Sequence, residues 1–417
     1  MAPSEATTIP NQGRPAKELL AEIAAGRAGD LDWKGGKAFS LVYNADDPTL
    51  EDLQHGVAKL FLHDNALNPF AYPSLMKMEA DLVSMMAGLL GTGHQAGVLT
   101  SGGSESIFCA VQTARDHARA ERSIAEPVVL LASTAHPAFT KAAHNLDVEA
   151  IRIPVDSSGV ADVSATEAAI DDRTAMIVGS APCYPYGVID PIEGLAQLAA
   201  SRGVLCHVDS CLGGLLLPFW AELGEPVPSW DFRVEGVTSM SADLHKYGYA
   251  YKGASVVLYR DRSLLKYQFF GFDDWPGGFY GSATPAGTRP APPIAGAWAT
   301  LMHLGRDGLL AKASTIRDTT AALRRGIESV GDFQILHDPA MSVLLFASAS
   351  KSAGLLGAAM AEKGWGLDVV QEGLHLMVSP GHSNIVDSFV ADLSAVWAAV
   401  SVDDRSSETP TYGSRAV

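Results

Sequence analysis

Short runs of β-branched and aliphatic residues alternate with longer segments of helical period between about residues 75 and 300. Seven such runs recur: AGVLTS, PVVLLAS, VEAIRIP, TAMIVGS, GVLCHVDS, EGVTSMS and ASVVLYR. Segments such as SESIFCAVQTARDHARAE and PIEGLAQLAASRG separate them, with apolar residues at helical spacing. Apolar strands joined by helices are typical of a parallel sheet that is covered on both faces. The sequence therefore predicts an α/β fold with a mostly parallel sheet between layers of helices.

The same patterning divides the chain into four predicted parts. Residues 1–70 form an N-terminal arm and helical segment, residues 71–300 the large sheet domain, and residues 301–402 a smaller C-terminal α+β domain. A helical stretch from about 294 to 329 leads to the smaller domain, whose strands are predicted in MSVLLFAS and LHLMVS. The first twelve or so residues and the tail 403–417 are polar, so we expect both ends to be disordered.

Composition and charge exclude several classes of partner. The formal net charge of −17, without clusters of Lys and Arg, argues against binding to nucleic acid. No apolar run reaches the ~18 to 20 residues that a membrane span needs, and the start of the chain does not resemble a signal peptide, so we expect no membrane anchor. The cysteines form no C-x-x-C pair and the histidines show no metal-ligand spacing. We therefore expect reduced thiols, no metal site and a cytoplasmic location. The four cysteines are Cys109, Cys183, Cys206 and Cys211.

A glycine-rich turn follows the first predicted strand of the large domain. In VLTSGGSES the strand gives way to Ser101, Gly102, Gly103 and Ser104, and a helix begins. Glycines allow backbone N–H groups to approach an anion, hydroxyls donate further hydrogen bonds, and the helix N-terminus carries partial positive charge. This turn is a candidate phosphate site. An ordinary helix N-cap would use the same residue types.

Three further residues complete a constellation with that turn. Asp209 ends the strand in GVLCHVDS, Lys246 follows the next strand in SADLHKYGYAYKG, and His136 follows another strand in LLASTAHPAF. Taken singly, the aspartate could be a helix cap, the lysine a surface residue and the histidine a cap or a core residue. Together with the turn they match pyridoxal phosphate: phosphate on the glycine-rich turn, ring nitrogen on Asp209, ring face under His136 and aldehyde joined to Lys246 as a Schiff base.

Longer blocks of the chain resemble the pyridoxal phosphate-dependent sphingosine-1-phosphate lyases. These blocks include TSGGSESI, STAHPAFTKAAH, HVDSCLGGLLLPF, SADLHKYGYAYKGAS, YQFFGFDDWPGGFYGS and AGTRP, and the resemblance covers about residues 40 to 380. The lyases belong to a wider group with the glutamate and aromatic amino acid decarboxylases. The resemblance implies the type I, aminotransferase-like fold and a homodimer with active sites at the subunit interface. It also implies that Lys246 carries the cofactor, that His245 lies beside the cofactor phosphate and that His136 covers the ring.

The resemblance also assigns a site for a substrate phosphate. It falls on Tyr43 in FSLVYNADD, on Lys252, and on the stretch DNALNPFAYPSL. In that stretch Asn65 matches the family asparagine, whereas Asn68 stands where the lyases carry a histidine. Recognition of the phosphate is thus expected to rest on Tyr43, Asn65, Asn68 and Lys252.

Three tyrosines complete the comparison with the family pattern. Tyr184 in SAPCYPYGVIDP matches an aromatic position that reaches the partner's active site. Tyr186 replaces a histidine, and Tyr251 stands where the lyases usually have proline. These two departures fit an amino acid decarboxylase better than a lyase, whereas Lys252 and Tyr43 fit the lyase.

The activity that the resemblance implies is carbon–carbon cleavage of a phosphorylated long-chain amino alcohol to a fatty aldehyde and phosphoethanolamine. Lys246, His245 and Tyr184 are the candidates for the proton transfers. An L-amino acid decarboxylase and a β-hydroxy-α-amino acid aldolase of the same fold remain alternatives. A catalytically silent scaffold is a fourth reading, which the presence of Lys246, Asp209 and His136 opposes.

Overall fold

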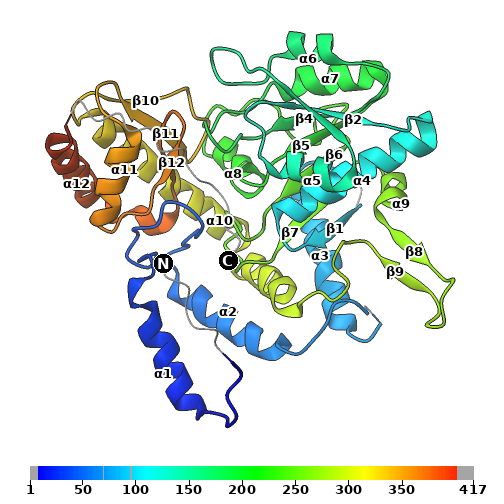
Figure 1. Cartoon of the computed structure of the whole chain (residues 1–417), viewed down its shortest axis with the longest axis horizontal. Helices are drawn as coiled ribbons and strands as arrows, with labels where there is room; N and C mark the ends of the chain where they lie inside the picture. Colours follow the sequence, from blue (N-terminus) through cyan, green and yellow to red (C-terminus); the bar gives the residue numbers. More distant parts are fainter. Residues whose placement is uncertain (1–7, 69, 94–95, 402–417) are drawn as a thin grey trace.

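The computed structural model describes residues 8–68, 70–93 and 96–401. Of the first twelve or so residues predicted to be disordered, residues 1–7 lie outside the described residues, as does the whole tail 403–417. Three helices precede the central sheet: α1 (Ala16–Gly26), α2 (Pro48–Phe61) and α3 (Pro73–Leu89). Helix α1 buries none of its side chains and extends from the lower end of the molecule in Figure 1. Helix α2 begins where the carboxylate of Asp47 accepts a hydrogen bond from the Leu50 backbone N–H.

The central sheet has seven strands in the order β1-β7-β6-β5-β4-β2-β3. Strands β2 to β6 pair with one another in parallel. Strand β7 lies between β6 and β1 and runs antiparallel to both. The predicted mostly parallel sheet is therefore confirmed, with one reversed strand. The strands are β1 (Gly97–Thr100), β2 (Val128–Ala132), β3 (Glu149–Ile153), β4 (Thr174–Ser180), β5 (Leu205–Asp209), β6 (Ser239–Ala242) and β7 (Ser255–Tyr259).

Helices cover both faces of this sheet (Figure 1). Val129 and Leu131 of β2 pack toward α4 and α5, while the alternate residues Val128 and Leu130 belong to the core on the opposite face. This two-sided burial explains why the strands are continuous apolar runs in the sequence. The helices and the hairpin of this region are α4 (Gly103–Arg122), α5 (Ala138–Leu146), α6 (Val163–Ala169), α7 (Ile192–Arg202), α8 (Leu217–Glu222), α9 (Leu265–Gln268), β8 (Phe270–Phe272) and β9 (Tyr280–Ser282).

Helix α10 (Ala291–Glu328) connects the large sheet to a smaller unit and is interrupted at Gly305, whose φ of 59° is left-handed. The predicted helix from about 294 to 329 is thus confirmed, and it crosses the proposed domain boundary at residue 300. The smaller unit is an antiparallel sheet in the order β10-β11-β13-β12 with two helices. Its elements are β10 (Phe333–Ile335), β11 (Val343–Ser348), α11 (Ala353–Glu362), β12 (Asp368–Val370), β13 (Gly373–Met377) and α12 (Val386–Ala399).

The segment between α1 and α2 joins the smaller unit to the rest of the chain. The Phe39 N–H donates to the Gly366 carbonyl, and the Met377 N–H donates to the Phe39 carbonyl. Tyr43 and Ser40, on the same segment, are thereby held near β12 and β13. Within the described part of the chain, no helix is both long enough and apolar enough to cross a membrane.

Candidate active site

The loops that follow β1, β2, β4, β5 and β6 meet in one cavity of about 410 Å³. Ligands of open α/β sheets bind at the carboxyl ends of parallel strands, which is where most of these loops leave the sheet. The cavity therefore lies where the topology predicts it. Its lining includes the predicted residues Ser101, Gly102, Gly103, Ser104, His136, Tyr184, Asp209, His245, Lys246 and Lys252.

The glycine-rich turn opens α4 without a side-chain cap. Gly102 is in extended backbone conformation and precedes the helix, so the first N–H groups of α4 have no capping side chain to satisfy them. At Gly103 a Cβ atom would lie only 2.6 Å from the Cys211 sulfur, so this close approach requires glycine. The missing cap and the close packing favour an anion cradle over the ordinary N-cap turn.

Lys246 is held by a buried carboxylate that the sequence reasoning missed. Its Nζ lies 3.0 Å from Oδ2 of Asp243, which is 3% exposed and lies 3.7 Å from His245 Nε2. Burial alone would lower the pKa of Lys246, but the Asp243 carboxylate outweighs it and raises that pKa well above its usual value. The available signal was the SAD-x-HK block, which places a carboxylate three residues before the lysine. Oδ1 of Asp243 has no hydrogen-bond partner among the described residues.

Asp209 ends β5 with its side chain in the cavity. Its Oδ1 accepts hydrogen bonds from the Cys211 backbone N–H at 3.1 Å and from the Ser241 hydroxyl at 3.2 Å. Both bonds end on Oδ1, so they fix the orientation of the carboxylate without using Oδ2. A fixed carboxylate in a buried site is suited to a cationic partner such as a protonated pyridine nitrogen.

The two predicted histidines flank the cavity. His136 Nδ1 accepts from the Ala138 N–H at the start of α5, so it caps that helix as well as lining the cavity. Its ring lies edge-on to Tyr184, with 6.3 Å between the ring centroids, and burial lowers its pKa. His245 Nδ1 accepts from the Ala254 N–H, and burial also lowers its pKa despite the opposing effect of Asp243. Both rings are thus expected to be neutral near pH 7.

These residues fit a pyridine cofactor with a phosphate tail. The uncapped turn at Gly103 suits the phosphate, Asp209 suits the ring nitrogen, and the Lys246 amine suits a carbonyl carbon. Asp243 lines the same cavity, and its buried Oδ1 has no hydrogen-bond partner among the described residues. Among the described residues no cluster of His, Cys, Asp and Glu has the arrangement of a metal site.

Lys252 and Tyr43 come together at the edge of this cavity. Lys252 Nζ lies 4.9 Å from the centroid of the Tyr43 ring and donates to the His245 carbonyl. A second cavity of about 260 Å³ adjoins the first and shares Lys252 and His245 with it. Tyr251 lines this second cavity, with its ring against Gly296 and its hydroxyl bonded to the Pro292 carbonyl. The predicted pairing of Tyr43 with Lys252 is present in the structure.

Asn65 and Asn68 are not brought to Lys252 within the described part of one chain. Asn65 bonds to Thr288, and Asn68 is exposed in a turn, where its side chain accepts from the Phe70 N–H. The loop is tied to the start of α10 because the Ala66 N–H donates to the Arg289 carbonyl. The predicted contact of Asn65 and Asn68 with a substrate phosphate therefore stays a prediction, which a single chain does not test.

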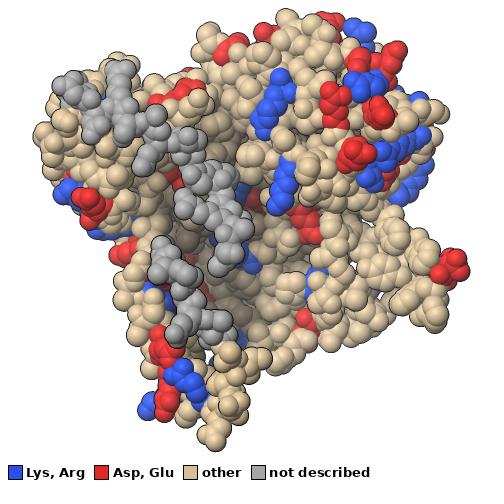
Figure 2. Space-filling view, in the orientation of Figure 1, with Lys and Arg blue, Asp and Glu red and all other residues tan. Residues whose placement is uncertain are grey.

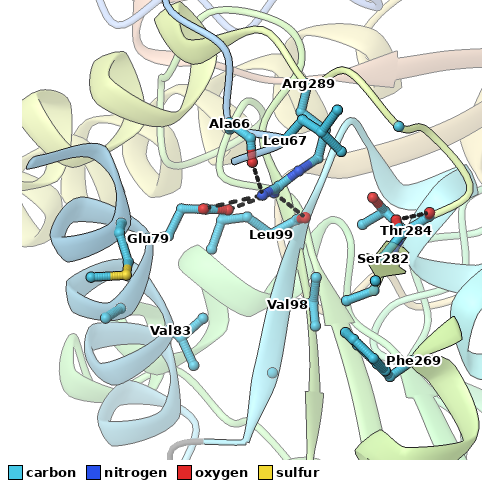
Figure 3. A pocket seen from close by; sticks show the side chains of 16 residues that line it. Ala66, Leu67, Glu79, Val83, Val98, Leu99, Phe269, Ser282, Thr284 and Arg289 are labelled. Atoms are coloured by element: carbon cyan, nitrogen blue, oxygen red, sulfur yellow. Dashed lines mark hydrogen bonds and ion pairs between the residues drawn. The ribbon is translucent and has the colours of Figure 1, made fainter. Parts of the chain in front are cut away.

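This loop borders a separate cavity of about 380 Å³, shown in Figure 3. The guanidinium of Arg289 reaches across it to the Glu79 carboxylate and to the carbonyls of Ala66 and Leu99. Both terminal nitrogens of the Arg289 guanidinium are thus engaged by the protein. This cavity contains none of the residues expected to carry chemistry.

Tyr184 and Tyr186 both reach the small sheet but differ in access to the active-site cavity. Tyr184 lines the cavity of its own chain, and its hydroxyl donates to Asp368 at 2.5 Å. Tyr186 does not line it; its ring stacks on His337 and its hydroxyl donates to Glu372. The replacement of the family histidine by Tyr186 therefore lies outside the cavity, which weakens it as an argument for a decarboxylase.

Three comparisons place the chain among known proteins. The pyridoxal-dependent decarboxylase conserved domain matches residues 59–349. The sphingosine-1-phosphate lyase of Oryza sativa subsp. japonica is 38% identical over 98% of this chain and 77% of that protein. A probable L-aspartate decarboxylase of Pyrococcus abyssi is 28% identical over 93% of this chain and 99% of that protein.

Similarity in structure leads to the same group. The solved sphingosine-1-phosphate lyase of Burkholderia pseudomallei K96243 superposes with a TM-score of 0.90 at 35% identity, covering 95% of this chain and 93% of that chain. The type I fold that the sequence predicts is therefore confirmed. This chain belongs to the sphingosine-1-phosphate lyase family, which carries the pyridoxal-dependent decarboxylase domain.

Proposed function

We propose that the chain is a pyridoxal phosphate-dependent lyase that cleaves the Cα–Cβ bond of a phosphorylated long-chain amino alcohol, such as sphingosine 1-phosphate. The products would be a fatty aldehyde and phosphoethanolamine. The observation that carries the proposal is Lys252, which lies beside Tyr43 at the edge of the active-site cavity. Among the described residues Lys252 has no acidic ion-pair partner, so its charge is available to a substrate phosphate.

The cofactor would be held by the residues of the larger cavity. The turn at Ser101 to Ser104 would bind its phosphate, Asp209 its ring nitrogen, His136 its ring face and Lys246 its aldehyde carbon. Once bound, pyridoxal phosphate supplies an electron sink that makes a bond to the substrate's Cα breakable. The loops around the cavity would orient the substrate so that the Cα–Cβ bond is the one that breaks.

The remaining chemistry belongs to side chains of the chain itself. Asp209 would keep a proton on the ring nitrogen, since its fixed carboxylate favours a cation. Asp243 would hold the Lys246 amine in place through the 3.0 Å contact of Oδ2 with Nζ. Lys246 and His245 would move protons at Cα, a role supported by their place in the cavity lining and by their shared contact with Asp243 Oδ2.

The two alternatives are less well supported. An L-amino acid decarboxylase or a β-hydroxy-α-amino acid aldolase acts on a substrate with an α-carboxylate and has no need of a cation placed for a phosphate. The similarity to the rice lyase, at 38% identity, exceeds that to the Pyrococcus decarboxylase, at 28%. Both observations favour cleavage of a phosphorylated amino alcohol.

The pKa of Lys252 makes this recognition pH dependent. Burial, and then the nearby Lys246 charge, lower that pKa to about 8, so Lys252 is charged below about pH 8 and neutral above it. We expect kcat/KM for the phosphorylated amino alcohol, relative to its free alcohol, to fall about tenfold between about pH 7 and about pH 9.5. The phosphate itself is already largely dianionic above its second pKa of about 6, so its own titration ends before this range.

Matched variants isolate the charge of Lys252. Lys252→Arg keeps a cation at all pH values, so its preference for the phosphorylated substrate should stay flat over the same range. Lys252→Gln has no cation at any pH, so its preference for the phosphorylated substrate should be as low at about pH 7 as that of the wild type at about pH 9.5. If the wild type showed no preference at any pH and Lys252→Gln changed nothing, the substrate would not be a phosphate monoester.

We also propose that the chain works as a homodimer. The hairpin of β8 and β9 exposes Phe270, Phe272, Trp275 and Phe279, and Figure 2 shows little charge over it apart from acidic side chains near its tip. Exposed apolar area of this kind is typical of an interface. A second chain would also offer a way to bring the exposed Asn68 near a substrate phosphate. Sedimentation at micromolar concentration should give twice the chain mass of 43.9 kDa, and a monomer that is fully active would contradict the proposal.

A cytoplasmic location remains a proposal as well. The four cysteines are all buried and unpaired in the structure, which supports a reducing compartment. Fractionation of the source cells, with the chain detected by antibody, would test it, and recovery from an oxidising compartment would contradict it.

A further inference from the structure

The hydroxyl of Tyr184 forms a hydrogen bond from the unit of the large sheet to a carboxylate in the unit of the small sheet. Tyr184 follows β4 and lines the active-site cavity, whereas Asp368 begins β12 of the small sheet. The Tyr184 hydroxyl donates to Asp368 Oδ2 at 2.5 Å, and the Ser40 hydroxyl donates to Oδ1 at 3.1 Å. The proton of Tyr184 is therefore directed at a carboxylate, so the hydroxyl oxygen can accept a second hydrogen from within the cavity.

A buried imidazole lies behind this carboxylate. His375, on β13, is directly paired in register with Asp368 and is fully buried. Its Nε2 lies 2.8 Å from the Tyr184 backbone carbonyl, which is an acceptor only, so Nε2 carries the hydrogen. Its Nδ1 lies 3.7 Å from Asp368 Oδ2 and has no hydrogen-bond partner among the described residues. Nδ1 and Asp368 Oδ2 thus lie just beyond hydrogen-bond distance, so a small approach with a proton between them would satisfy both.

The carboxylate is ionised in this setting. Burial acts to raise the pKa of Asp368, but it is outweighed by the interaction with His375, which acts when the imidazole is protonated, and by the hydrogen bonds from Tyr184 and Ser40, so the pKa lies below its usual value. A group with a lowered pKa is already deprotonated above its ordinary range, so Asp368 is charged near pH 7. It is therefore ionised as the acceptor of the Tyr184 hydrogen bond, and because a lowered pKa makes it a weak base on its own, a proton that reaches it from Tyr184 has to be shared with His375.

We propose that Tyr184, Asp368 and His375 form a proton relay that removes the β-hydroxyl proton of the substrate as the Cα–Cβ bond breaks. Tyr184 is the catalytic residue, and Asp368 and His375 are positioning residues that act through it. This inference rests on the proposed lyase function, because a decarboxylase substrate has no β-hydroxyl that must be deprotonated.

The step balances in protons and electrons. The substrate O–H bond breaks, and its proton forms a new O–H bond on Tyr184 Oη. The original Tyr184 proton passes to Asp368, where it is shared with the bare Nδ1 of His375. The electron pair of the substrate O–H bond becomes the second bond of the aldehyde carbonyl, and the pair of the breaking Cα–Cβ bond stays with Cα.

The chain offers a matched control two residues away. Tyr186 comes from the same segment and also donates its hydroxyl to a small-sheet carboxylate, that of Glu372, but it does not line the cavity. Tyr186→Phe and Glu372→Gln thus remove the same kind of bridge between the same two units without touching the proposed relay.

The test compares two reactions of the holoenzyme. The first is aldehyde release from sphingosine 1-phosphate, which needs the β-hydroxyl proton to leave. The second is exchange of the Cα hydrogen of phosphoethanolamine in D₂O, followed by NMR, which involves no β-hydroxyl. Asp368→Asn should lower kcat for aldehyde release about 10²-fold, with a KM within about twofold and with little change in exchange. His375→Gln, which keeps a donor to the Tyr184 carbonyl, should lower aldehyde release about tenfold.

A double-mutant cycle shows whether Asp368 acts through Tyr184. Tyr184→Phe should reduce aldehyde release at least as much as Asp368→Asn, and combining the two should cost no more than Tyr184→Phe alone. The control variants Tyr186→Phe and Glu372→Gln should leave both reactions within about twofold of the wild type.

The outcomes separate the relay from the lyase function. If the wild type catalyses both reactions but Asp368→Asn lowers exchange as much as aldehyde release, Asp368 has a structural role and the relay is overturned. Additive losses in the cycle, or equal losses in the Tyr186 and Glu372 controls, would overturn it too. If the wild type releases no aldehyde at all, the lyase function fails, and the relay fails with it.

Discussion

Lys246→Ala is expected to lose both covalent attachment of the cofactor and all measurable turnover. The Lys246 amine lies 3.0 Å from Asp243 Oδ2 within the cavity, and we propose that it, rather than Lys252, bonds the cofactor aldehyde. The wild type should be yellow and should yield, after borohydride reduction and digestion, one peptide with cofactor on Lys246. The variant should yield no such peptide.

Lys252→Ala is the matched control for that experiment. Lys252 lines the same cavity but lies beside Tyr43 and donates to the His245 carbonyl. This variant should keep the yellow colour and the labelled Lys246 peptide while losing its preference for a phosphorylated substrate. A reduced adduct on Lys252, or on any lysine other than Lys246, would contradict the assignment.

Asp209→Asn should bind the cofactor and lose about 10³-fold or more in kcat. Asparagine keeps an Oδ1 that can accept from the Cys211 N–H and the Ser241 hydroxyl, so the fold around β5 should be retained. It lacks the charge that keeps a pyridine nitrogen protonated, so the electron sink should fail.

Binding and rate must be measured separately for this variant. Cofactor affinity from fluorescence titration should change little, because the turn at Gly103 is untouched, while single-turnover rates should collapse. Retention of more than about a tenth of the wild-type kcat, a loss under ~1.4 kcal/mol, would show that Asp209 is not the partner of the ring nitrogen.

The strands of the large sheet could be predicted because burial on two faces forces apolar runs, whereas in the small sheet only β11 and β13 were predicted, since β10 and β12 are short and partly exposed. TAMIVGS coincides with β4 (Thr174–Ser180), every residue of which is buried. The direction of β7 could not be predicted, since ASVVLYR is equally apolar in either orientation and carries no signal for pairing antiparallel to β6. Nor could the end of the large domain be located, because α10 continues as helix across residue 300 and is interrupted only at Gly305.

Residues of the site were predictable where one local segment carries the signal. The turn at Gly103, the strand end at Asp209 and the lysine at 246 each follow a recognisable strand. Asp368 and His375 gave no such signal, because both are far from Tyr184 in the sequence. Asp368 lies 184 residues after Tyr184, and His375 lies 191 residues after it. Asn68 shows the opposite limit: its correspondence with a family position predicts a role, but in the structure its side chain accepts a hydrogen bond from the Phe70 N–H in an exposed turn.

Product analysis tests the central claim most directly. The purified holoenzyme would be incubated separately with sphingosine 1-phosphate, L-aspartate and an aromatic amino acid, with aldehyde, phosphoethanolamine and carbon dioxide each quantified. The account predicts equal amounts of aldehyde and phosphoethanolamine from sphingosine 1-phosphate and no carbon dioxide from either amino acid. Carbon dioxide from an amino acid, with no aldehyde from sphingosine 1-phosphate, would contradict it.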